Sequence, residues 1–363
     1  MAPDVASMST TPTTCTPKSS QKPPAGPNVL EVVFGSLLIK PWYPSFYPEE
    51  LVGRRVERLY VCQWCFKYSK ELVGFLGHLV RQSRDKPWRR YRMQERWANM
   101  CFSRQKACPL RTTPPPGVCV YTKNRYSLYE IDGEKHKLYA QNLCLFAKLF
   151  LDTKSVFYDV TTFLYYLLVA HEPVPDIPNT RFAEDDKANA MRQGQGQGQG
   201  QVVGFFSKEK MSWDNNNLAC ILVFPPWQKQ GLGQILMGAS YEISTREERL
   251  GGPEKPLSDL GRIAYIHYWS ATLTRAILAA PSKQTLTVEH LRDKTYIVPE
   301  DILVTLQAMD VLEHKKRGGA EAVINKAKVR AWAEKHGVDL KNGPVDPDAF
   351  SVREGSWAGC GDD

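Results

Sequence analysis

The first residues with a chemically suggestive spacing are two cysteines and a histidine. Cys62 and Cys65 enclose two residues, and His78 follows after twelve more. Thiolate sulfurs and imidazole nitrogens are common ligands of structural zinc, and a Cys-x-x-Cys pair supplies two of them from one turn. The spacing therefore predicts a zinc site of the C2HC type, whose fourth ligand has to come from elsewhere in the chain.

A second segment has the residue types that suit a phosphate group. The apolar run 218–224 leads into a turn that contains Lys229, Gly231 and Gly233, and a helical pattern follows. Such a turn presents backbone N–H groups at the positive end of a helix dipole, and glycine lets a phosphate approach closely. The turn matches neither the Walker-type phosphate loop nor the dinucleotide-binding glycine pattern. Taken alone, it is either a phosphate-binding turn or an ordinary helix start.

The elements that must position these groups include both strands and helices, which is typical of an α+β protein. Asp132-Gly133 between two apolar runs predicts a β-hairpin over 126–139. Alternating or continuous apolar residues predict strands over 29–34, 202–206 and 218–224, and a strand, a turn and a strand over 156–168. Helical spacing predicts helices over 143–151, 232–249 and 262–278 and one that begins near Pro299.

The composition divides the chain into five parts. We expect a disordered tail over 1–27, N-terminal strands and a zinc finger over 28–125, a core over 126–283, a helical unit over 284–336 and a loose tail over 337–363. Within the core, the polar segment 172–201 ends in a Gln-Gly repeat and predicts a flexible surface loop.

The overall composition limits the class of protein. The chain has 363 residues, 42% of them hydrophobic, and a formal net charge of +8. No apolar run approaches the roughly 20 residues of a membrane span, and the N-terminal residues lack the apolar core of a secretory signal. We therefore expect no membrane segment and nine cysteines that act as thiols, ligands or nucleophiles rather than in disulfides. The mild basic charge is compatible with nucleic-acid or chromatin association without requiring it.

Several longer runs resemble one family, the MYST histone acetyltransferases. The runs are NLCLFAKLFLD at 142–152, GFFSKEK at 204–210, NLACILVFPP at 217–226, QKQGLG at 228–233 and PEKPLSDLG at 253–261. They follow the family's order and approximate spacing, and the resemblance covers about residues 29–314. Phe205-Phe206 and the ending Val223-Phe224-Pro225-Pro226 look most like the fungal silencing-type (SAS) branch.

The resemblance implies an acetyltransferase core of the GNAT-like type, a mixed sheet with flanking helices, between the C2HC finger and a winged-helix-like unit. It implies transfer of acetyl from acetyl-CoA to a histone tail lysine by direct attack, with Glu254 as general base. Cys220 matches the cysteine beside the thioester, either as an acyl-accepting nucleophile or, as we favour, as a supporting residue. Backbone N–H groups near Cys220 are expected to stabilise the oxyanion.

Further residues receive roles from the same resemblance. The backbone of Ile221, Leu222 and Val223 is expected to pair with the pantetheine arm like an added strand. Ser258 is expected to reach the coenzyme, or else simply to cap a helix, and Lys154 is expected to become autoacetylated unless it is an ordinary exposed lysine. The pyrophosphate is expected to be wrapped by Gln228, Lys229, Gln230, Gly231, Leu232, Gly233 and Gln234.

The zinc finger departs from the family pattern. The family's fourth ligand closely follows the histidine, whereas Gln82 occupies the nearest expected place here. We interpret the Arg- and Trp-rich run of about 79–106 as an insertion, either genuine or a retained intron, because family-like sequence resumes at Ala107-Cys108-Pro109. Cys108 is then the expected fourth ligand and Cys101 the alternative.

The resemblance also implies partners and a location. We expect the substrate to be a histone tail, H4 in particular, on a nucleosome, and the protein to act in the nucleus within a chromatin-modifying complex. The basic insert and Lys315-Lys316-Arg317 suggest at most weak, non-specific contact with DNA. The alternative is a catalytically defective chromatin-binding module that keeps only the zinc finger and the winged-helix-like unit.

Overall fold

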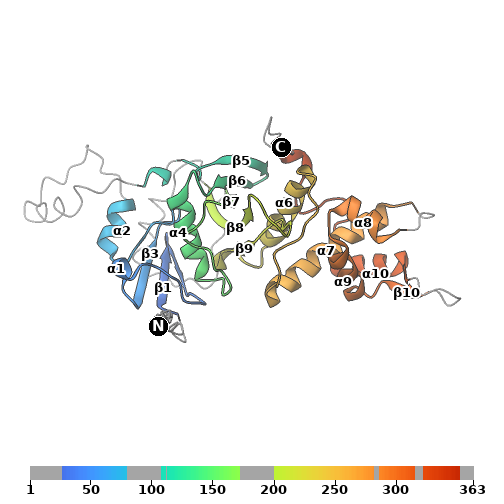
Figure 1. Cartoon of the computed structure of the whole chain (residues 1–363), viewed down its shortest axis with the longest axis horizontal. Coiled ribbons are helices and arrows are strands. Elements are labelled where there is room, and N and C mark those ends of the chain that lie inside the picture. The colour runs from blue at the N-terminus through green and yellow to red at the C-terminus, as the bar shows by residue number, and fades with distance from the viewer. Residues whose placement is uncertain are drawn as a thin grey trace, which may run out of the picture.

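The predicted strand over 29–34 is confirmed and opens a small N-terminal sheet. The computed structural model describes residues 27–79, 108–111, 113–171, 200–281, 286–314 and 322–351. The sheet has the order β2-β1-β3-β4, in which β1 (Val29–Phe34) pairs in parallel with β3 (Val56–Val61). The other elements of this unit are β2 (Leu37–Ile39), α1 (Glu49–Val52), β4 (Tyr68–Ser69) and α2 (Leu72–Leu79). Figure 1 shows this unit in blue at one end of the molecule.

A five-stranded sheet forms the centre of the chain. Its order is β5 (Val118–Lys123), β6 (Tyr126–Asp132), β7 (Phe163–Ala170), β8 (Gln201–Glu209) and β9 (Cys220–Val223), and all neighbours are antiparallel. The parallel pairing expected in the core sheet occurs there as the bridge between Pro253 and Leu218 just before β9, and a parallel pair of strands, β1 and β3, lies in the N-terminal sheet. Strand β9 lies at one edge, which leaves one side of it without a neighbouring strand of the described sheet.

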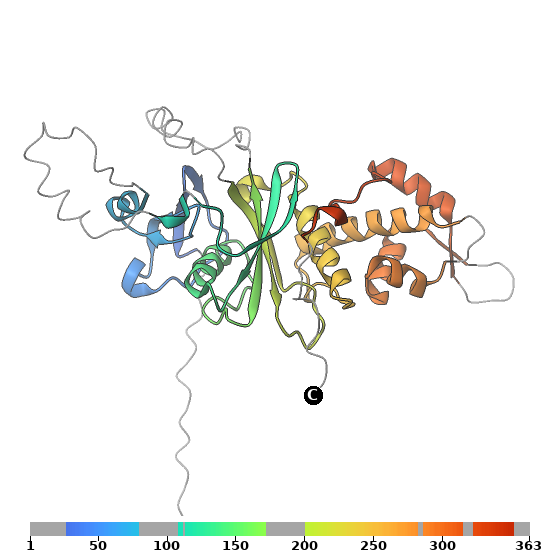
Figure 2. The ribbon, with the colours of Figure 1, turned by 90° about the horizontal axis from the view of Figure 1, so that it is seen from above.

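Helices cover both faces of this sheet. Helix α4 (Lys137–Lys148) lies between the five-stranded sheet and the N-terminal sheet, and α6 (Leu232–Arg246) lies on the opposite face (Figure 2). Nearly every residue of α4 from Tyr139 onward is buried, as expected for a helix packed on two sides. Phe146 of α4 stacks on Phe34 at 4.6 Å and meets Phe224 edge-on at 5.1 Å. These rings join the two sheets into one core.

Two expectations about the sheet are wrong. Asp132-Gly133 does not turn a hairpin: β6 ends at Asp132 and α4 begins four residues after Gly133, at Lys137. A Cβ on Gly133 would lie 1.9 Å from the Val160 carbonyl oxygen, so a close backbone approach, rather than a tight turn, accounts for the glycine. The hairpin joins β5 to β6 instead, around Asn124 with φ +55°.

The segment 156–168 also differs from the expectation. It contributes one strand, β7, which begins at Phe163, and residues 156–162 are turns and bends. The apolar residues of this segment nevertheless join the core: Val160 is fully buried and Phe157 stacks on Phe46 at 4.8 Å. The sequence pattern therefore identified burial correctly and assigned the wrong backbone conformation.

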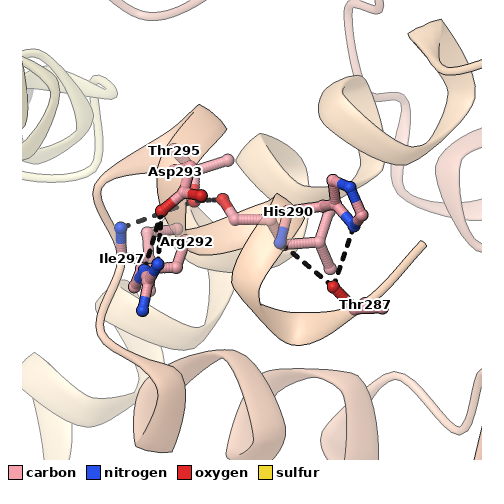
Figure 3. A network of polar contacts seen from close by, with 7 residues as sticks. Thr287, His290, Arg292, Asp293, Thr295 and Ile297 are labelled. Atoms are coloured by element: carbon pink, nitrogen blue, oxygen red, sulfur yellow. Dashed lines mark hydrogen bonds and ion pairs between the residues drawn. The ribbon is translucent and has the colours of Figure 1, made fainter.

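The predicted helices after β9 are confirmed, and a helical unit follows them. The elements are α7 (Asp259–Ala279), α8 (Val288–Thr295), α9 (Pro299–Ala308), β10 (Leu312–His314), β11 (Ala322–Ile324) and α10 (Lys326–His336). Thr287 caps α8 by accepting the N–H of His290, and the Thr295 hydroxyl closes its last turn (Figure 3). Pro299 occupies the first turn of α9, as predicted.

The chain returns to the central sheet after α10, which differs from the loose tail expected over 337–363. Phe350 follows the short 3₁₀ helix η3 (Pro347–Ala349) and packs on Tyr121 of β5 at 4.7 Å. Lys123 forms an ion pair with Asp346 at 2.6 Å, and the N–H of Ser351 donates to Val120. Aromatic packing and sheet pairing thus hold residues 346–351, although the sequence there is polar and Pro-rich.

The remaining expectations fall outside the described residues. They concern the tail over 1–26, most of the basic insert, the Gln-Gly segment over 172–199, the basic tip at 315–317 and residues 352–363. In the described part of the chain, no helix combines the length and the apolarity that crossing a membrane requires.

Candidate active site and metal centre

Four possible metal ligands meet beside the N-terminal sheet. The ligand atoms of Cys62, Cys65, His78 and Cys108 all lie within 4.8 Å of one another. Cys62 follows β3, and a tight turn with Phe66 at φ +57° brings Cys65 back towards it. His78 is in the last turn of α2. These elements therefore hold the three ligands that the spacing predicted.

Cys108 is the fourth member of the cluster. Its N–H donates to the carbonyl of His78 at 2.8 Å, so the chain returns to the end of α2 despite the long intervening segment. Its Sγ lies 3.9 Å from Cys62 Sγ. The alternative ligand, Cys101, is outside the described residues.

The geometry and chemistry of the cluster fit zinc. A Zn–S bond of about 2.3 Å and tetrahedral angles place two sulfur ligands roughly 3.8 Å apart. The Cys62–Cys108 separation is 3.9 Å, and Cys65 Sγ lies 3.2 Å from His78 Nε2. Three thiols and one imidazole are a donor set of a structural zinc site.

A second group of reactive side chains meets at the start of β9. Cys220 is half-buried, and its Sγ lies 3.8 Å from Nζ of Lys154. Lys154 follows α4 and is only 5% exposed, so it is not the exposed lysine of the alternative interpretation. The N–H of Cys220 donates to the Ser207 hydroxyl at 3.3 Å. The structure thus brings Lys154 and Cys220 together from segments far apart in the sequence.

Glu254 reaches the same end of β9 through backbone pairing. The N–H of Glu254 donates to the carbonyl of Leu218 at 2.9 Å, and the N–H of Asn217 donates to Gly252 at 2.8 Å. The segment 251–254 therefore runs alongside the residues that lead into β9, which fixes the backbone while the carboxylate stays accessible to solvent. A carboxylate held in this way beside Cys220 is suited to proton transfer.

The electrostatic surroundings of Glu254 favour a base stronger than an ordinary carboxylate. Partial desolvation raises the pKa of Glu254 above its usual value of 4.5, and the nearby charge of Glu209 raises it further. The ammonium of Lys154 acts in the opposite direction. Burial lowers the pKa of Lys154 itself, but its interactions with Cys220 and Cys144 raise it by more.

The open edge of β9 offers only part of the backbone expected to bind the pantetheine arm. The N–H of Phe224 donates to Val203, and hydrogen-bonded pairs alternate along an antiparallel ladder. The backbone N–H and C=O groups of Leu222 therefore also face β8, whereas those of Ile221 and Val223 face the open edge. The Val223 carbonyl already accepts a hydrogen bond from Gln228 Nε2 at 2.9 Å.

The glycine turn that follows has the features of an anion site. Gly231 has φ +79° and is the N-cap of α6, with no side chain that accepts the first N–H groups of this helix. A Cβ at Gly231 or Gly233 would meet no atom within 4 Å, so the space in front of the turn is open. The exposed Lys229 stands in the same turn with φ +61°. An anionic phosphate fits this combination of dipole, open space and charge.

The other expected coenzyme residues are placed as follows. Ser258 caps α7 by accepting the N–H of Gly261 at 3.1 Å, which is the plainer of its two expected roles. Gln234 Nε2 donates to Ala264 at 3.4 Å and so ties the turn to α7. Gln230 is exposed, whereas Leu232 is buried and anchors the start of α6 in the core.

Sequence reasoning missed three neighbours of this site. Cys144 of α4 interacts with Lys154 and donates to the Tyr165 hydroxyl at 3.4 Å, and Ser207 accepts from Cys220. Cys144 and Ser207 lie in the runs that resemble the family, but only their place in the fold gives them a partner.

Comparisons with known proteins agree with this arrangement. Residues 114–182 and 190–350 match the MOZ/SAS family, and residues 27–81 match the MYST family zinc finger domain. The chain is 35% identical to a histone acetyltransferase Tip60 homolog of Caenorhabditis elegans over 329 residues, 90% of this chain and 60% of that protein. It is 36% identical to the histone acetyltransferase MOF of Drosophila melanogaster over 293 residues, 81% of this chain and 29% of that protein.

A plant relative gives the same result. The chain is 35% identical to the histone acetyltransferase of the MYST family 1 of Arabidopsis thaliana over 289 residues, 80% of this chain and 52% of that protein. The chain thus spans 60% or less of the length of these relatives. Because the family match covers most of the chain and includes Cys62, Cys65 and His78 of the zinc cluster as well as the β9 edge, the chain belongs to the MOZ/SAS family of MYST proteins.

Proposed function

We propose that this chain is a protein-lysine acetyltransferase that transfers acetyl from acetyl-CoA to a lysine of a histone tail. The observation that carries the proposal is the group at the start of β9, where Lys154 contacts Cys220 and the Glu254 segment pairs with Leu218. The open edge of β9 leads from this group to the glycine turn at Gly231. A thioester bound along that edge would have its acyl end near the carboxylate and its phosphates at the turn.

The chain's own residues have distinct roles in this proposal. Acetyl-CoA supplies the acetyl group as an activated thioester. Glu254 accepts a proton from the ammonium of the substrate lysine, which is necessary because a free lysine has a pKa near 10.4. The resulting amine forms a bond to the thioester carbonyl carbon, the C–S bond breaks, and coenzyme A leaves as a thiolate that takes up a proton. The N–H of Ile221 faces the open edge and is the nearest unpaired candidate to stabilise an oxyanion, since the N–H of Cys220 already donates to Ser207. Cys220 supports the pocket wall beside Lys154, and the substrate lysine attacks the thioester directly rather than through an acyl-cysteine.

The coenzyme, the metal and the modification are part of the same proposal. Ile221 and Val223 would pair with the pantetheine arm, and residues 228–234 would wrap the pyrophosphate. Cys62, Cys65, His78 and Cys108 would hold a structural zinc ion. Lys154 would be acetylated by the protein itself, which removes a charge from a buried position.

The substrate and the setting follow from the relatives and from the resemblance to the silencing-type branch. The similar proteins of Caenorhabditis elegans, Drosophila melanogaster and Arabidopsis thaliana are named histone acetyltransferases. We therefore assign a histone tail as the substrate, histone H4 as the preferred one, a chromatin-modifying complex as the setting and the nucleus as the location.

Transfer of labelled acetyl tests the proposal. The protein and its Glu254→Gln variant are incubated with labelled acetyl-CoA and an H4 tail peptide, and Glu57→Gln, an exposed position on β3, serves as the matched control. General bases contribute about 10²–10⁴-fold, so Glu254→Gln should lose that factor in kcat/KM while the control keeps full activity. No transfer by the wild type would favour the catalytically defective module, and equal transfer by both would reject Glu254 as the base.

A further inference from the structure

The loop between β8 and β9 carries two large apolar side chains in water. Trp213 is 99% exposed and Met211 is 75% exposed. A tryptophan side chain usually buries about 150–250 Å² in a core or an interface. Because Trp213 is almost fully exposed, the isolated chain gains no free energy from burying its ring. Two such residues, separated by one position, form a small apolar tip.

The loop that carries this apolar tip contacts the Glu254 segment through its later residues, Asn215 to Asn217. The N–H of Asn217 donates to Gly252, and a Cβ on Gly251 would lie 1.8 Å from the carbonyl oxygen of Asn215. The backbones of the loop and of the Glu254 segment are therefore in direct contact. The tip and Glu254 are each two to four residues from these backbone contacts, so a peptide that reaches Glu254 can also reach the loop.

The backbone of the loop is fixed although its apolar side chains are free. The N–H of Lys210 donates to Thr162 at 2.9 Å, and its ammonium forms an ion pair with Asp132 at 2.8 Å. Within the loop, the Ser212 hydroxyl accepts the N–H of Asn216 at 3.1 Å. The tip is thus a preformed surface, which lowers the entropy cost of binding a partner.

The charges around the tip favour a cationic partner. The neighbouring lysines are already neutralised, since Lys208 pairs with Glu247, Lys210 with Asp132 and Lys255 with Asp301. In the described part of the chain, Glu209, Asp214 and Glu254 have no ion-pair partner. Arg249, which lines a small hollow under the loop together with Glu247, is the one unpaired cation among the described residues that line it. The ammonium of Lys154, which acts on Glu254, is a second cation, so three carboxylates against two cations leave a local excess of one negative charge.

We propose that Trp213 and Met211 form a docking point for a basic peptide, in which the Trp213 ring receives a Lys or Arg side chain that flanks the acetylated lysine. Tryptophan has the strongest cation–π interaction of the aromatic side chains, and the surrounding carboxylates attract the same cation. Met211 supplies apolar contact for the aliphatic part of that side chain. This inference rests on the proposed function, because it names the surface by which the site recognises its substrate.

Binding measured without catalysis tests the inference. A fluorescein-labelled H4 tail peptide is titrated with the full chain, its Trp213→Ala variant and its Trp213→Phe variant, and anisotropy gives the Kd. An exposed cation–π contact corresponds to about a two- to five-fold change in Kd, so Trp213→Ala should weaken binding by that factor and Trp213→Phe by less. The thermal midpoints of the variants should equal that of the wild type, because the side chain is exposed.

Two controls isolate the contact. Leu138 of α4 is 70% exposed and distant in the chain from Trp213. Leu138→Ala therefore removes an exposed apolar side chain elsewhere and should leave the Kd unchanged. A peptide whose Lys and Arg residues next to the acceptor lysine are replaced by alanine should bind the wild type and Trp213→Ala equally well. An unchanged Kd for Trp213→Ala, or an equal loss with the neutralised peptide, overturns the inference.

The test of the docking surface and the test of the proposed function can fail independently of each other. If the wild type transfers no acetyl but Trp213→Ala weakens peptide binding, the docking surface stands and the acetyltransferase assignment fails. If Glu254→Gln abolishes transfer and the Kd for Trp213→Ala is unchanged, the assignment stands and the docking surface fails. In an active enzyme the defect of Trp213→Ala should appear in the KM for the peptide, with the KM for acetyl-CoA and kcat unchanged.

Discussion

Replacing Cys108 by serine tests the metal centre at the residue that the sequence spacing alone did not provide. Structural zinc sites bind their metal with roughly 10–16 kcal/mol, so an even share for each of four ligands is about 2.5–4 kcal/mol. That share corresponds to a loss in zinc affinity of about 10²–10³-fold. Because the cluster fastens β3 to α2, the same free energy is lost from the folded state.

The expected loss of stability is large for a single substitution. For a chain of 363 residues about 2.5–4 kcal/mol lowers the thermal midpoint by roughly 3–5 °C. The effect should extend beyond the finger, since Phe34 of the N-terminal sheet stacks on Phe146 of α4 in the shared core. Perturbing the finger therefore loosens one wall of the core that supports the β9 edge.

The assay is zinc content after dialysis against a chelator, together with the thermal midpoint. We expect one zinc per wild-type chain and its loss in Cys108→Ser at chelator concentrations that the wild type withstands. Cys119→Ser, a half-buried cysteine of β5 outside the cluster, is the matched control and should keep its zinc. Retention of one tightly bound zinc by Cys108→Ser, with loss of zinc in Cys101→Ser, would refute the assignment of the fourth ligand.

Two further predictions concern the β9 edge. Gly231→Ala places a Cβ at φ +79°, which costs on the order of 1 kcal/mol in stability and should raise the KM for acetyl-CoA by disturbing the turn. Gly337→Ala, at φ +61° and the C-cap of α10, has the same strain away from the turn, so an equal rise in KM for both variants would argue against a phosphate role. Lys154→Met removes the charge that lowers the pKa of Glu254. Since the base must be ionised, the fall in kcat/KM at acidic pH should then occur at higher pH than in the wild type. The control is Lys148→Met, which removes another buried lysine, one that donates to the backbone carbonyl of Asp152, and it should leave the pH of this fall unchanged. An unchanged pH of the fall in Lys154→Met would contradict the electrostatic effect of Lys154 on Glu254.

The zinc ligands illustrate how far the sequence reaches. Cys62, Cys65 and His78 follow from local spacing, because one short turn and one helix suffice to bring them together. Cys108 lies beyond a long insertion and could be proposed only by resemblance to the family. What places it is a hydrogen bond to the carbonyl of His78, a long-range contact that no local pattern contains.

The strands and helices also divide into those that a local pattern predicts and those that depend on contacts distant in the sequence. Periodicity predicted β1, α6 and α7, since their apolar residues recur at strand or helix spacing. It failed at Asp132-Gly133, where the dipeptide typical of a hairpin precedes a helix because Gly133 is needed to pass the Val160 carbonyl. It failed again at Phe350, whose polar neighbours gave no sign that its ring packs on Tyr121.

Lys154 shows why the chemistry of the site needs the fold. The local sequence Asp152-Thr153-Lys154 reads as an exposed turn, yet the ammonium is buried, and its hydrogen-bond partners among the described residues are the sulfurs of Cys220 and Cys144. These sulfurs raise the pKa of Lys154 by more than burial lowers it, so the ammonium is compensated inside the pocket, and conversion to a neutral amide would give up those interactions. The same conversion would remove the positive charge that lowers the pKa of Glu254. Acetylation of Lys154 would therefore exchange the ammonium–sulfur interactions for a stronger base at the neighbouring carboxylate of Glu254.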